Sequence, residues 1–518
     1  MLTMSRVPAT LIAVVLACPC LAHAATFTVN STGNSGDAAV GNGFCATAEN
    51  QCTLRAAIQE ANVTTALDTI RFAIGSGPQR ISVPENLPTA TAPVVIDGST
   101  QPGFSGAPLI EISGSLFLDD GIRLTGGNST LRGVVVNGFG RNGVVLAVNG
   151  GNVIEGNYIG TNAAGTAIVR NQSAGVWIES HSNRIGGLTI PQRNIISGNG
   201  GFGMEGGVVI YGAAAVGNIV QGNFIGLDVT GMSPLANLGR GVAIHGASHN
   251  LIGGQEPGAG NLIAGNRASG VRIMSGSTGN VVWRNWIGVN KLGETRVGEY
   301  PQPGTLSNAR GVQIRGDGNY VLENLIAGNT EDGVLFYDGF GRDLIPLGFP
   351  RNNLVYGNYI YQNGFSGIGV FVGDRNRFVK NSIFANGHIG INLEEREFGL
   401  VTPNDADDSD TGTNGFQNFP VLQSATAVGG VTTVAGTLAS RPSGMYTLEF
   451  YASPSCGLLG HGEGAYSLGQ TTVTTDAAGA AAFNAVLAFA VPPGLVVTAT
   501  ATDPAGSTSE FSACIVVQ

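Results

Sequence analysis

A short phrase with alternating apolar and polar positions recurs along the middle of the chain. It has the form Gly-Val-x-Ile, and Asn-x-Ile-x-Gly-Asn stands between its copies. In the copy that begins at Gly175, Val176 and Ile178 are the apolar positions. Successive side chains of a strand point to opposite faces, so these two face inward and Trp177 and Glu179 face outward. The phrase therefore predicts a short strand with one buried face.

The copies follow one another at steps of 22 to 41 residues, which is typical of stacked-repeat proteins. They begin at Gly143, Gly175, Gly207, Gly241, Gly270, Gly311, Gly333 and Gly367. Each copy is too short and too rich in glycine for a pair of helices. The pattern predicts several short strands per coil, and hence an all-β chain that winds into a right-handed parallel β-helix over residues 66–400. Recurrent Asn residues after the turns are expected to stack as amide ladders along this solenoid.

Both ends of the repeat region change character. Residues 25–65 predict an N-terminal cap with a strand and a helix at 53–62, whose N-cap is Thr53. A solenoid needs such a lid because its terminal coil exposes apolar surface and unpaired strand edges. Residues 401–418 form an acidic linker. Residues 419–518 predict a β-sandwich, with strands at 446–451, 471–474, 482–487 and 496–501.

The first 24 residues have the features of a secretory signal. Arg6 precedes a short apolar run at 11–17, and Ala22-His23-Ala24 is a suitable cleavage site. The apolar run is too short to span a bilayer, and no later segment is long enough. Cys18 also lies in a loose lipoprotein-type box, so free secretion and lipid anchoring at the cell surface both stay open.

Four cysteines follow the signal segment: Cys45, Cys52, Cys456 and Cys514. An even number in an exported protein predicts disulfides, for which three connectivities exist. Locality favours Cys45–Cys52 and Cys456–Cys514, because each pair then lies within one predicted unit. A metal site is the alternative, although no His is interleaved at zinc-like spacing.

Glycine makes up 81 of 518 residues and charged residues only 12%, but 43% apolar content argues against disorder. The net charge is −10 and no basic run is present, which excludes nucleic acid as an expected partner. The negative net charge likewise argues against direct binding to an anionic membrane surface. We expect a monomer.

Several segments resemble a family of bacterial surface proteins named for a Cys-Ser-Leu-Arg-Glu-Ala segment. Here Cys52 begins the corresponding run, in which Thr53 replaces Ser and Ala56 replaces Glu. Similar phrases stand at 95–103, 157–161 and 250–254. The resemblance covers nearly the whole mature chain and implies an exported right-handed parallel β-helix repeat protein. It implies no catalytic motif.

The acidic linker offers a candidate metal site. Its carboxylates are Asp405, Asp407, Asp408 and Asp410. Oxygen ligands at alternating positions suit Ca²⁺, although the spacing is not that of an EF-hand. A calcium-stiffened junction and a solvated linker both stay open.

The outward positions of the repeated strand carry the candidate chemistry, since the common hydrolase and metalloprotease motifs are missing. Coils lie about 4.8 Å apart, so these side chains are expected to lie on neighbouring coils of one face, within roughly 15 Å of one another. The candidate catalytic residues are His245, Arg272, Arg315 and Tyr337, and the candidate substrate-binding residues are Trp177, Glu179, Tyr211, Gln313 and Phe371.

Aromatic rings beside polar groups on a long face suit a polysaccharide, and arginine favours carboxylates of uronic acids. β-Elimination fits this set best, with Arg272 and Arg315 neutralising the carboxylate and His245 as base. Tyr337 or Tyr211 would protonate the leaving oxygen. Hydrolysis ranks lower because it needs two placed carboxylates. A binding groove without chemistry, or a non-catalytic adhesive spacer with a merely solvated face, are the alternatives.

Overall fold

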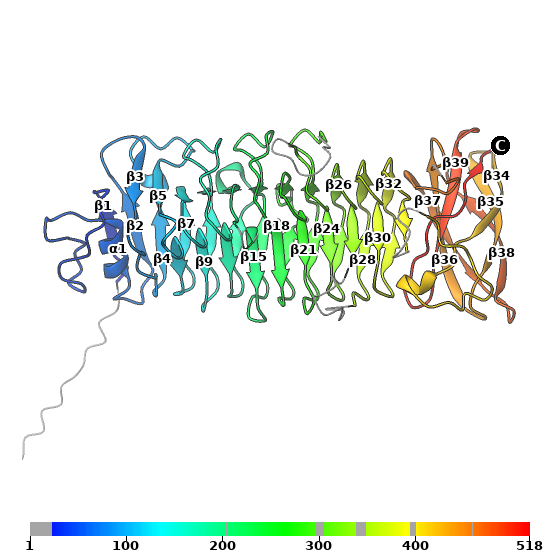
Figure 1. Cartoon of the computed structure of the whole chain (residues 1–518), viewed down its shortest axis with the longest axis horizontal. Coiled ribbons are helices and arrows are strands. Elements are labelled where there is room, and N and C mark those ends of the chain that lie inside the picture. Colours follow the sequence, from blue (N-terminus) through cyan, green and yellow to red (C-terminus); the bar gives the residue numbers. More distant parts are fainter. Residues whose placement is uncertain are drawn as a thin grey trace, which may run out of the picture.

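The structure is a computed structural model that describes residues 23–201, 203, 205–295, 305–337, 349–393, 400–457 and 459–518. These residues form a long solenoid with a helix near its start and a small β-domain at its C-terminal end (Figure 1). Most of the predicted signal peptide, including Cys18, lies outside the described residues. Within them, no helix is long and apolar enough to cross a membrane.

Three long parallel sheets make up the solenoid in the described residues, and from β4 onward each coil contributes one strand to each of them. In the described residues, sheet A contains β1 (Thr26–Val29), β2 (Asp68–Phe72), β4 (Val94–Asp97), β7 (Thr130–Arg132), β10 (Val153–Glu155), β13 (Arg184–Gly186), β16 (Ile219–Gln221), β19 (Leu251–Gly253), β22 (Val281–Trp283), β25 (Tyr320–Leu322), β28 (Leu354–Tyr356) and β31 (Arg377–Val379).

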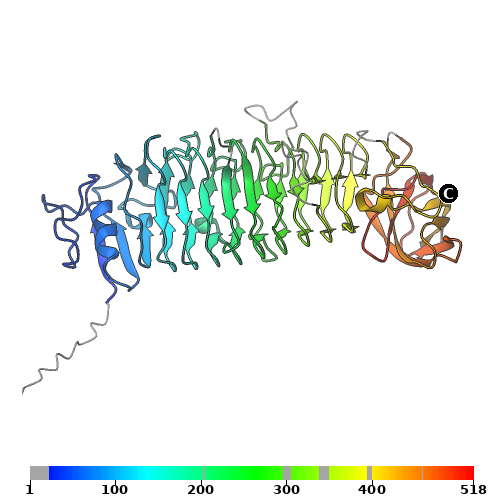
Figure 2. The same cartoon turned by 60° about the horizontal axis from the view of Figure 1, so that its bottom comes forward.

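Sheet B contains β3 (Gln79–Ser82), β5 (Ile110–Ser113), β8 (Val134–Asn137), β11 (Tyr158–Ile159), β14 (Ile195–Ile196), β17 (Phe224–Ile225), β20 (Leu262–Ile263), β23 (Trp286–Ile287), β26 (Leu325–Ala327), β29 (Tyr359–Tyr361) and β32 (Ser382–Phe384). Sheet C contains β6 (Ile122–Leu124), β9 (Val144–Leu146), β12 (Val176–Ile178), β15 (Gly206–Tyr211), β18 (Arg240–His245), β21 (Val271–Ile273), β24 (Val312–Ile314), β27 (Val334–Phe336), β30 (Ile368–Val370) and β33 (Ile391–Asn392). Figure 2 shows the coils side by side along the axis.

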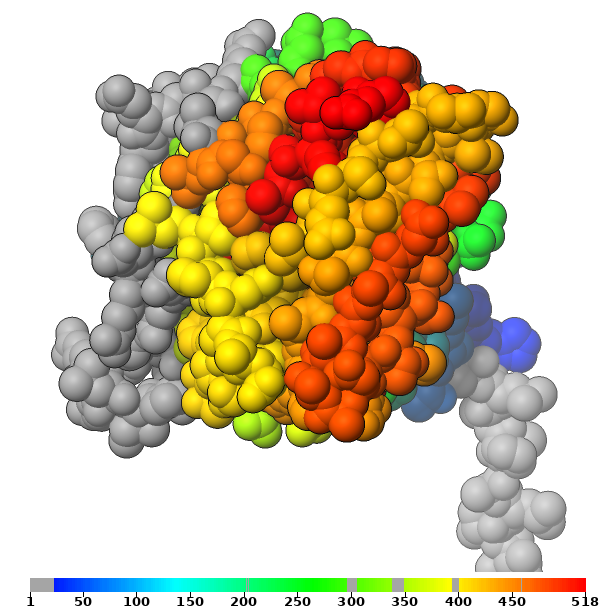
Figure 3. Space-filling model, turned by 90° about the vertical axis from the view of Figure 1, so that its right-hand side faces the viewer, coloured from blue at the N-terminus to red at the C-terminus, as the bar shows by residue number. Residues whose placement is uncertain are grey.

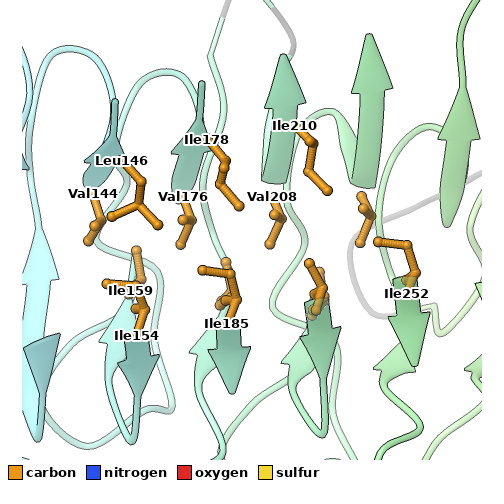
Figure 4. Packing of buried hydrophobic residues seen from close by; sticks show 14 of the residues in the cluster. Val144, Leu146, Ile154, Ile159, Val176, Ile178, Ile185, Val208, Ile210 and Ile252 are labelled. Carbon is orange, nitrogen blue, oxygen red and sulfur yellow. The ribbon is translucent and has the colours of Figure 1, made fainter. Parts of the chain in front are cut away.

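The core lies between the three sheets, where one apolar side chain or pair from each strand points inward. Figure 4 shows Val144 and Leu146 of sheet C facing Ile154 of sheet A and Ile159 of sheet B. All four side chains are fully buried. The alternation predicted from the repeated phrase is confirmed, because Val176 and Ile178 belong to this same core.

Three ladders of buried asparagines follow the three corners of the solenoid, as the sequence predicted. In each ladder the Oδ1 atom of one Asn accepts hydrogen bonds from the backbone N–H and, along most of the ladder, the side-chain amide of the Asn one coil earlier. Its own amide also donates to a backbone carbonyl. The ladders run through Asn152, Asn183, Asn218, Asn250, Asn280, Asn319, Asn353, Asn376 and Asn414; through Asn157, Asn194, Asn223, Asn261, Asn285, Asn324, Asn358 and Asn381; and through Asn171, Asn199, Asn237, Asn266, Asn308, Asn329, Asn363 and Asn386.

The N-terminal cap is confirmed. Helix α1 (Leu54–Ala61) starts at Thr53, whose hydroxyl accepts the N–H of Ala56. Its apolar side chains join the solenoid core. Strand β1 pairs in parallel with β2, so the cap also supplies the first strand of sheet A. The predicted Cys45–Cys52 disulfide is present.

The C-terminal domain is a sandwich that covers the end of the solenoid (Figure 3). One sheet contains β34 (Val421–Val428), β35 (Val431–Ala439) and β38 (Ala480–Leu487), and the other contains β36 (Met445–Ser453), β37 (Tyr466–Thr474), β39 (Val496–Thr502) and β40 (Ile515–Val516). The predicted strands are found, whereas β34 and β35 were missed. The Cys456–Cys514 disulfide is confirmed.

Two polar residues end asparagine ladders at this junction. The carboxylate of Glu463, from the sandwich, accepts the N–H groups of Ala385 and Asn386 and the amide of Asn386. Asn414, in the short 3-10 helix Thr413–Phe416, accepts the N–H of Asn376. Asn414 and Asp408 are buried, whereas Asp407 and Ser409 are exposed, so residues 401–418 are solvated only in part. Side chains of the segment bond both neighbours: the Asn414 amide donates to the Asn376 carbonyl of the solenoid, and Asp408 accepts the Ser440 hydroxyl.

We expect Asn285→Ala to reduce the free energy of unfolding by roughly 2–4 kcal/mol, because it leaves buried partners on two neighbouring coils unsatisfied. The Asn285 amide donates to the Ile252 carbonyl, and its Oδ1 accepts the Asn261 N–H. Guanidinium unfolding followed by tryptophan fluorescence measures the change. Asn149→Ala is the matched control: this exposed amide bonds only the Thr125 carbonyl, so its effect should stay within about 0.5 kcal/mol. Equal effects of both variants would show that the ladders do not stabilise the fold.

Candidate functional site on the outward face of sheet C

The strands of sheet C are in register, so their outward side chains form columns along the solenoid. The first column consists of the residue that follows the first apolar position of each repeated phrase. Its members are Trp177, Val209, Ala243, Arg272, Gln313, Leu335 and Gly369. A second column lies two residues further on, where Tyr211 pairs with His245. The expectation that distant residues share this face is therefore met by the strand register.

Two aromatic groups lie along the second column, and the first of them includes Trp177 of the neighbouring column. In the first group the ring of Tyr211 lies 5.3 Å from that of Trp177 and 6.2 Å from that of His245. The indole N–H of Trp177 donates to Glu179 at 2.9 Å, which holds that ring against the face. In the second group the Arg315 guanidinium lies 5.7 Å from the Tyr337 ring, which meets Phe371 edge-on at 6.3 Å.

Arg272 lies between these groups. None of the ion pairs in the described chain includes it, and its buried Nε atom has no hydrogen-bond partner there, although Glu205 is close enough to act on its charge. Burial, together with the neighbouring guanidiniums of Arg240, Arg315 and Arg310, lowers the pKa of Arg272 to about 9. Unpaired buried charge of this kind is unfavourable unless an anion joins it.

His245 is also left without a partner on its Nε2 atom within the described residues. Burial lowers the pKa of His245 to about 4, and the positive charges of Arg240, Arg272 and Arg315 add to this shift. The imidazole is consequently neutral at physiological pH and can accept a proton.

Sequence reasoning missed a third set of charged residues on this face. They stand one or two positions before the repeated glycine: Glu205, Arg240, Arg310, Glu331 and Asp332. Arg240 lies 3.9 Å from Glu205, and Arg310 lies 2.5 Å from Glu331. Burial raises the pKa of Asp332 to about 7, and its Oδ1 accepts the Ser366 N–H. A search of the positions preceding each glycine, as well as those following it, would have found them.

Four guanidiniums therefore share this face with the carboxyl groups of Glu179, Glu205 and Glu331 and with Asp332, whose pKa burial raises to about 7. The face thus gathers arginines in a chain whose net charge is −10. Gln313 contributes nothing to a ligand surface: it is only 3% exposed and accepts a hydrogen bond from Ser269. Tyr337 and His245 are three coils apart, or about 14 Å at the usual strand spacing.

The profile of the family described as "Right handed beta helix region" matches residues 305–422. Three parallel sheets stacked coil upon coil decide the architecture of the described chain. It folds as a right-handed parallel β-helix. No curated protein shows significant sequence similarity to it.

The β-helix is similar to several solved structures at low sequence identity. ORF18 of Geobacillus virus E2 is 11% identical, with 95% of this chain and 76% of that chain covered and a TM-score of 0.40. The A-module of mannuronan C-5 epimerase AlgE6 from Azotobacter vinelandii is 16% identical, with 68% and 95% covered and a TM-score of 0.39. The enzymatically active domain of bacteriophage CBA120 tailspike protein 2 is 12% identical, with 94% and 76% covered and a TM-score of 0.36. At these values the similarity does not extend to what the β-helix binds.

The acidic segment at the end of the β-helix brings three of its four predicted ligands together. Ligand oxygens of Asp405, Asp408 and Asp410 all lie within 4.8 Å of one another, whereas Asp407 is exposed and outside the group. Both carboxylate oxygens of Asp408 accept hydrogen bonds, from the Asn418 N–H and the Ser440 hydroxyl. One oxygen each of Asp405 and Asp410 is buried without a partner. Burial, with mutual repulsion, raises the pKa of Asp408 and of Asp410. The donor set fits a hard cation such as Ca²⁺.

We expect about 10 mM Ca²⁺ to stabilise the protein by roughly 1.4–2.7 kcal/mol, if its affinity is that of extracellular sites. The measurement is the shift of the thermal unfolding midpoint on adding calcium to chelator-treated protein. The double variant Asp405→Asn, Asp410→Asn should not respond. Asp407→Asn is the matched control, and calcium should stabilise it as much as the wild type. If this variant also loses the calcium response, or if calcium does not shift the midpoint of the wild type, the proposed site is wrong.

Proposed function

We propose that the chain binds an acidic polysaccharide along the outward face of sheet C. The observation that carries this is Arg272, a partly buried guanidinium that forms no ion pair within the described residues and lies beside other arginines. A guanidinium presents its N–H groups as a planar fork that matches a carboxylate, and an anion would relieve the repulsion. A purely structural solenoid gives no reason to collect like charges on one face.

A polymer fits this face better than a small molecule because the side chains extend along the axis. Between Trp177 and Phe371 the outward face of sheet C extends over six coil steps, or roughly 30 Å at the usual strand spacing. The rings of Trp177, Tyr211 and Phe371 would stack on sugar faces at intervals, while Arg272 and Arg315 bind carboxylates between them. The two disulfides fit a place of action outside a reducing cytoplasm.

The same geometry supports β-elimination as the reaction. Arg272 would neutralise the uronate carboxylate, and neutral His245 would remove the proton from the carbon beside it. The bond to the leaving oxygen then breaks as a carbon–carbon double bond forms, and that oxygen takes a proton. Tyr211 is the better donor because its ring contacts His245, whereas Tyr337 lies three coils away and serves in binding.

Hydrolysis is less well supported because the carboxylates of this face are already engaged. Glu179 accepts the Trp177 indole N–H, and Glu205 and Glu331 each lie beside an arginine. No pair of these groups faces open space in the manner that an acid and a nucleophile or base require.

We expect Arg272→Gln to weaken binding of polygalacturonate or alginate by about 10- to 100-fold, as loss of charged hydrogen bonds requires. Affinity electrophoresis in gels containing each polymer measures this, and Arg315→Gln should act in the same direction. Arg284→Gln is the control, because Arg284 pairs with Glu323 away from sheet C. If Arg272→Gln is retarded as strongly as the wild type, the outward face of sheet C is not the binding site.

We expect His245→Gln to abolish release of unsaturated uronate products while binding is retained. In the wild type the rate should fall as the pH drops through about 4, because protonated His245 cannot accept a proton, and this group should impose no dependence above that range. The assay is the ultraviolet absorbance of the new double bond. Binding without any such product would restrict the function to recognition, and an acid limb near the pKa of an unperturbed histidine would argue against His245 as base.

A further inference from the structure

Sheet B carries exposed aromatic side chains that the sheet C site does not use. Trp286 is 41% exposed and Tyr359 is 59% exposed, although both lie in regular strands. They belong to one outward column in register with Leu262, Leu325 and Ser382. The residues that follow them in the strands, Ile287 and Ile360, point into the core. Large exposed rings in a row mark a surface built for contact.

Earlier members of the same column, such as Tyr158 and Phe224, are buried in a cluster that includes loop residues Leu227 and Val229. Leu325, which lies between Trp286 and Tyr359 in the column, is partly buried and packs against this cluster, whereas the rings on either side of it are exposed. Trp286 and Tyr359 are two coils apart, about 10 Å at the usual strand spacing.

Two cavities lie along this open column. A cavity of about 430 Å³ is lined by Phe224, Leu262, Trp286 and Lys291, among others. A cavity of about 720 Å³ continues past Tyr359 to the junction with the sandwich, where Tyr466, 63% exposed, forms part of its wall. The larger cavity lies between the solenoid and the sandwich, and cavities of this size between domains are common ligand sites.

Hydrogen-bonding groups line the two cavities beside the rings. Lys291 lines the smaller cavity and Lys380 the larger one, and the ion pairs of the described chain include neither of them. The hydroxyl-bearing residues Ser455 and Ser467 add to the wall of the larger cavity. A protein partner would favour a continuous apolar patch with a polar rim, whereas separate rings with hydrogen-bond donors beside them suit a chain of sugars.

We propose that a surface called here the sheet B track, which consists of Trp286, Leu325 and Tyr359 of this column, Tyr466 of the sandwich and the two cavities, binds a neutral saccharide chain by ring stacking. Each aromatic side chain would cover the apolar face of one sugar, and Lys291 and Lys380 would bond hydroxyl groups between them. The track is separate from the sheet C face, so its occupancy does not depend on the acidic polymer proposed above.

Affinity electrophoresis of the intact protein in gels containing hydroxyethylcellulose, laminarin or galactomannan tests this proposal. At least one of these polymers should retard the wild type. Trp286→Ala and Tyr359→Ala should each weaken binding about five- to tenfold, as loss of a central contact residue does, and the double variant should migrate as in a gel without polymer.

Tyr320→Ala is the matched control, because Tyr320 is an equally exposed aromatic residue on sheet A, 40% exposed. It should leave the retardation unchanged, and so should Arg272→Gln. Absence of retardation by all three polymers overturns the proposal. Retardation that survives in the Trp286 and Tyr359 double variant, or that is lost in Arg272→Gln, overturns it as well.

Discussion

The buried asparagine ladders are the interaction on which the rest of the structure depends. At each corner of each coil, a side-chain amide satisfies the backbone of its own turn and of the turn beside it. These groups are nearly inaccessible to water. A backbone group left without a hydrogen bond at such a position would therefore be costly. The ladders therefore hold neighbouring coils at one spacing and in one register. Because the corners are fixed in this way, the strands between them can be as short as two or three residues.

A fixed register turns the repeat into a set of parallel columns. Residues that are 30 or more positions apart in the chain become neighbours at strand spacing, as Tyr211 and His245 do. The inward columns must be apolar, since they fill the space between three sheets. The outward columns are not constrained by the core, so each sheet can carry its own surface chemistry. Sheet C collects arginines, and sheet B exposes aromatic rings.

The two ends of the solenoid are closed by different means. At the start, helix α1 places its apolar face on the first coil. At the other end, Glu463 and Asn414 each occupy the position that another ladder asparagine would take. Glu463 of the sandwich and Asn414 of the preceding segment thus complete the hydrogen bonding of the last coil, and the sandwich also forms a wall of the cavity that follows Tyr359. The domain that closes the solenoid therefore also lines part of the proposed sheet B track.

The sequence by itself determined the coil. Alternation in Gly-Val-x-Ile, the asparagines after the turns, the helix at Thr53 and the local cysteine pairs each depend on nearby residues, and the structure confirms all of them. Spacing of the phrase also placed His245, Arg272, Arg315 and Tyr337 on one face. Only the tertiary structure decided which of these side chains meet. It put Tyr211 rather than Tyr337 beside His245, engaged Gln313 with Ser269, and added Arg240 and Asp332 from positions before the glycine. The reason is physical: the period of a strand fixes the direction of a side chain, but burial, charge and contact depend on what the neighbouring coils and loops place against it.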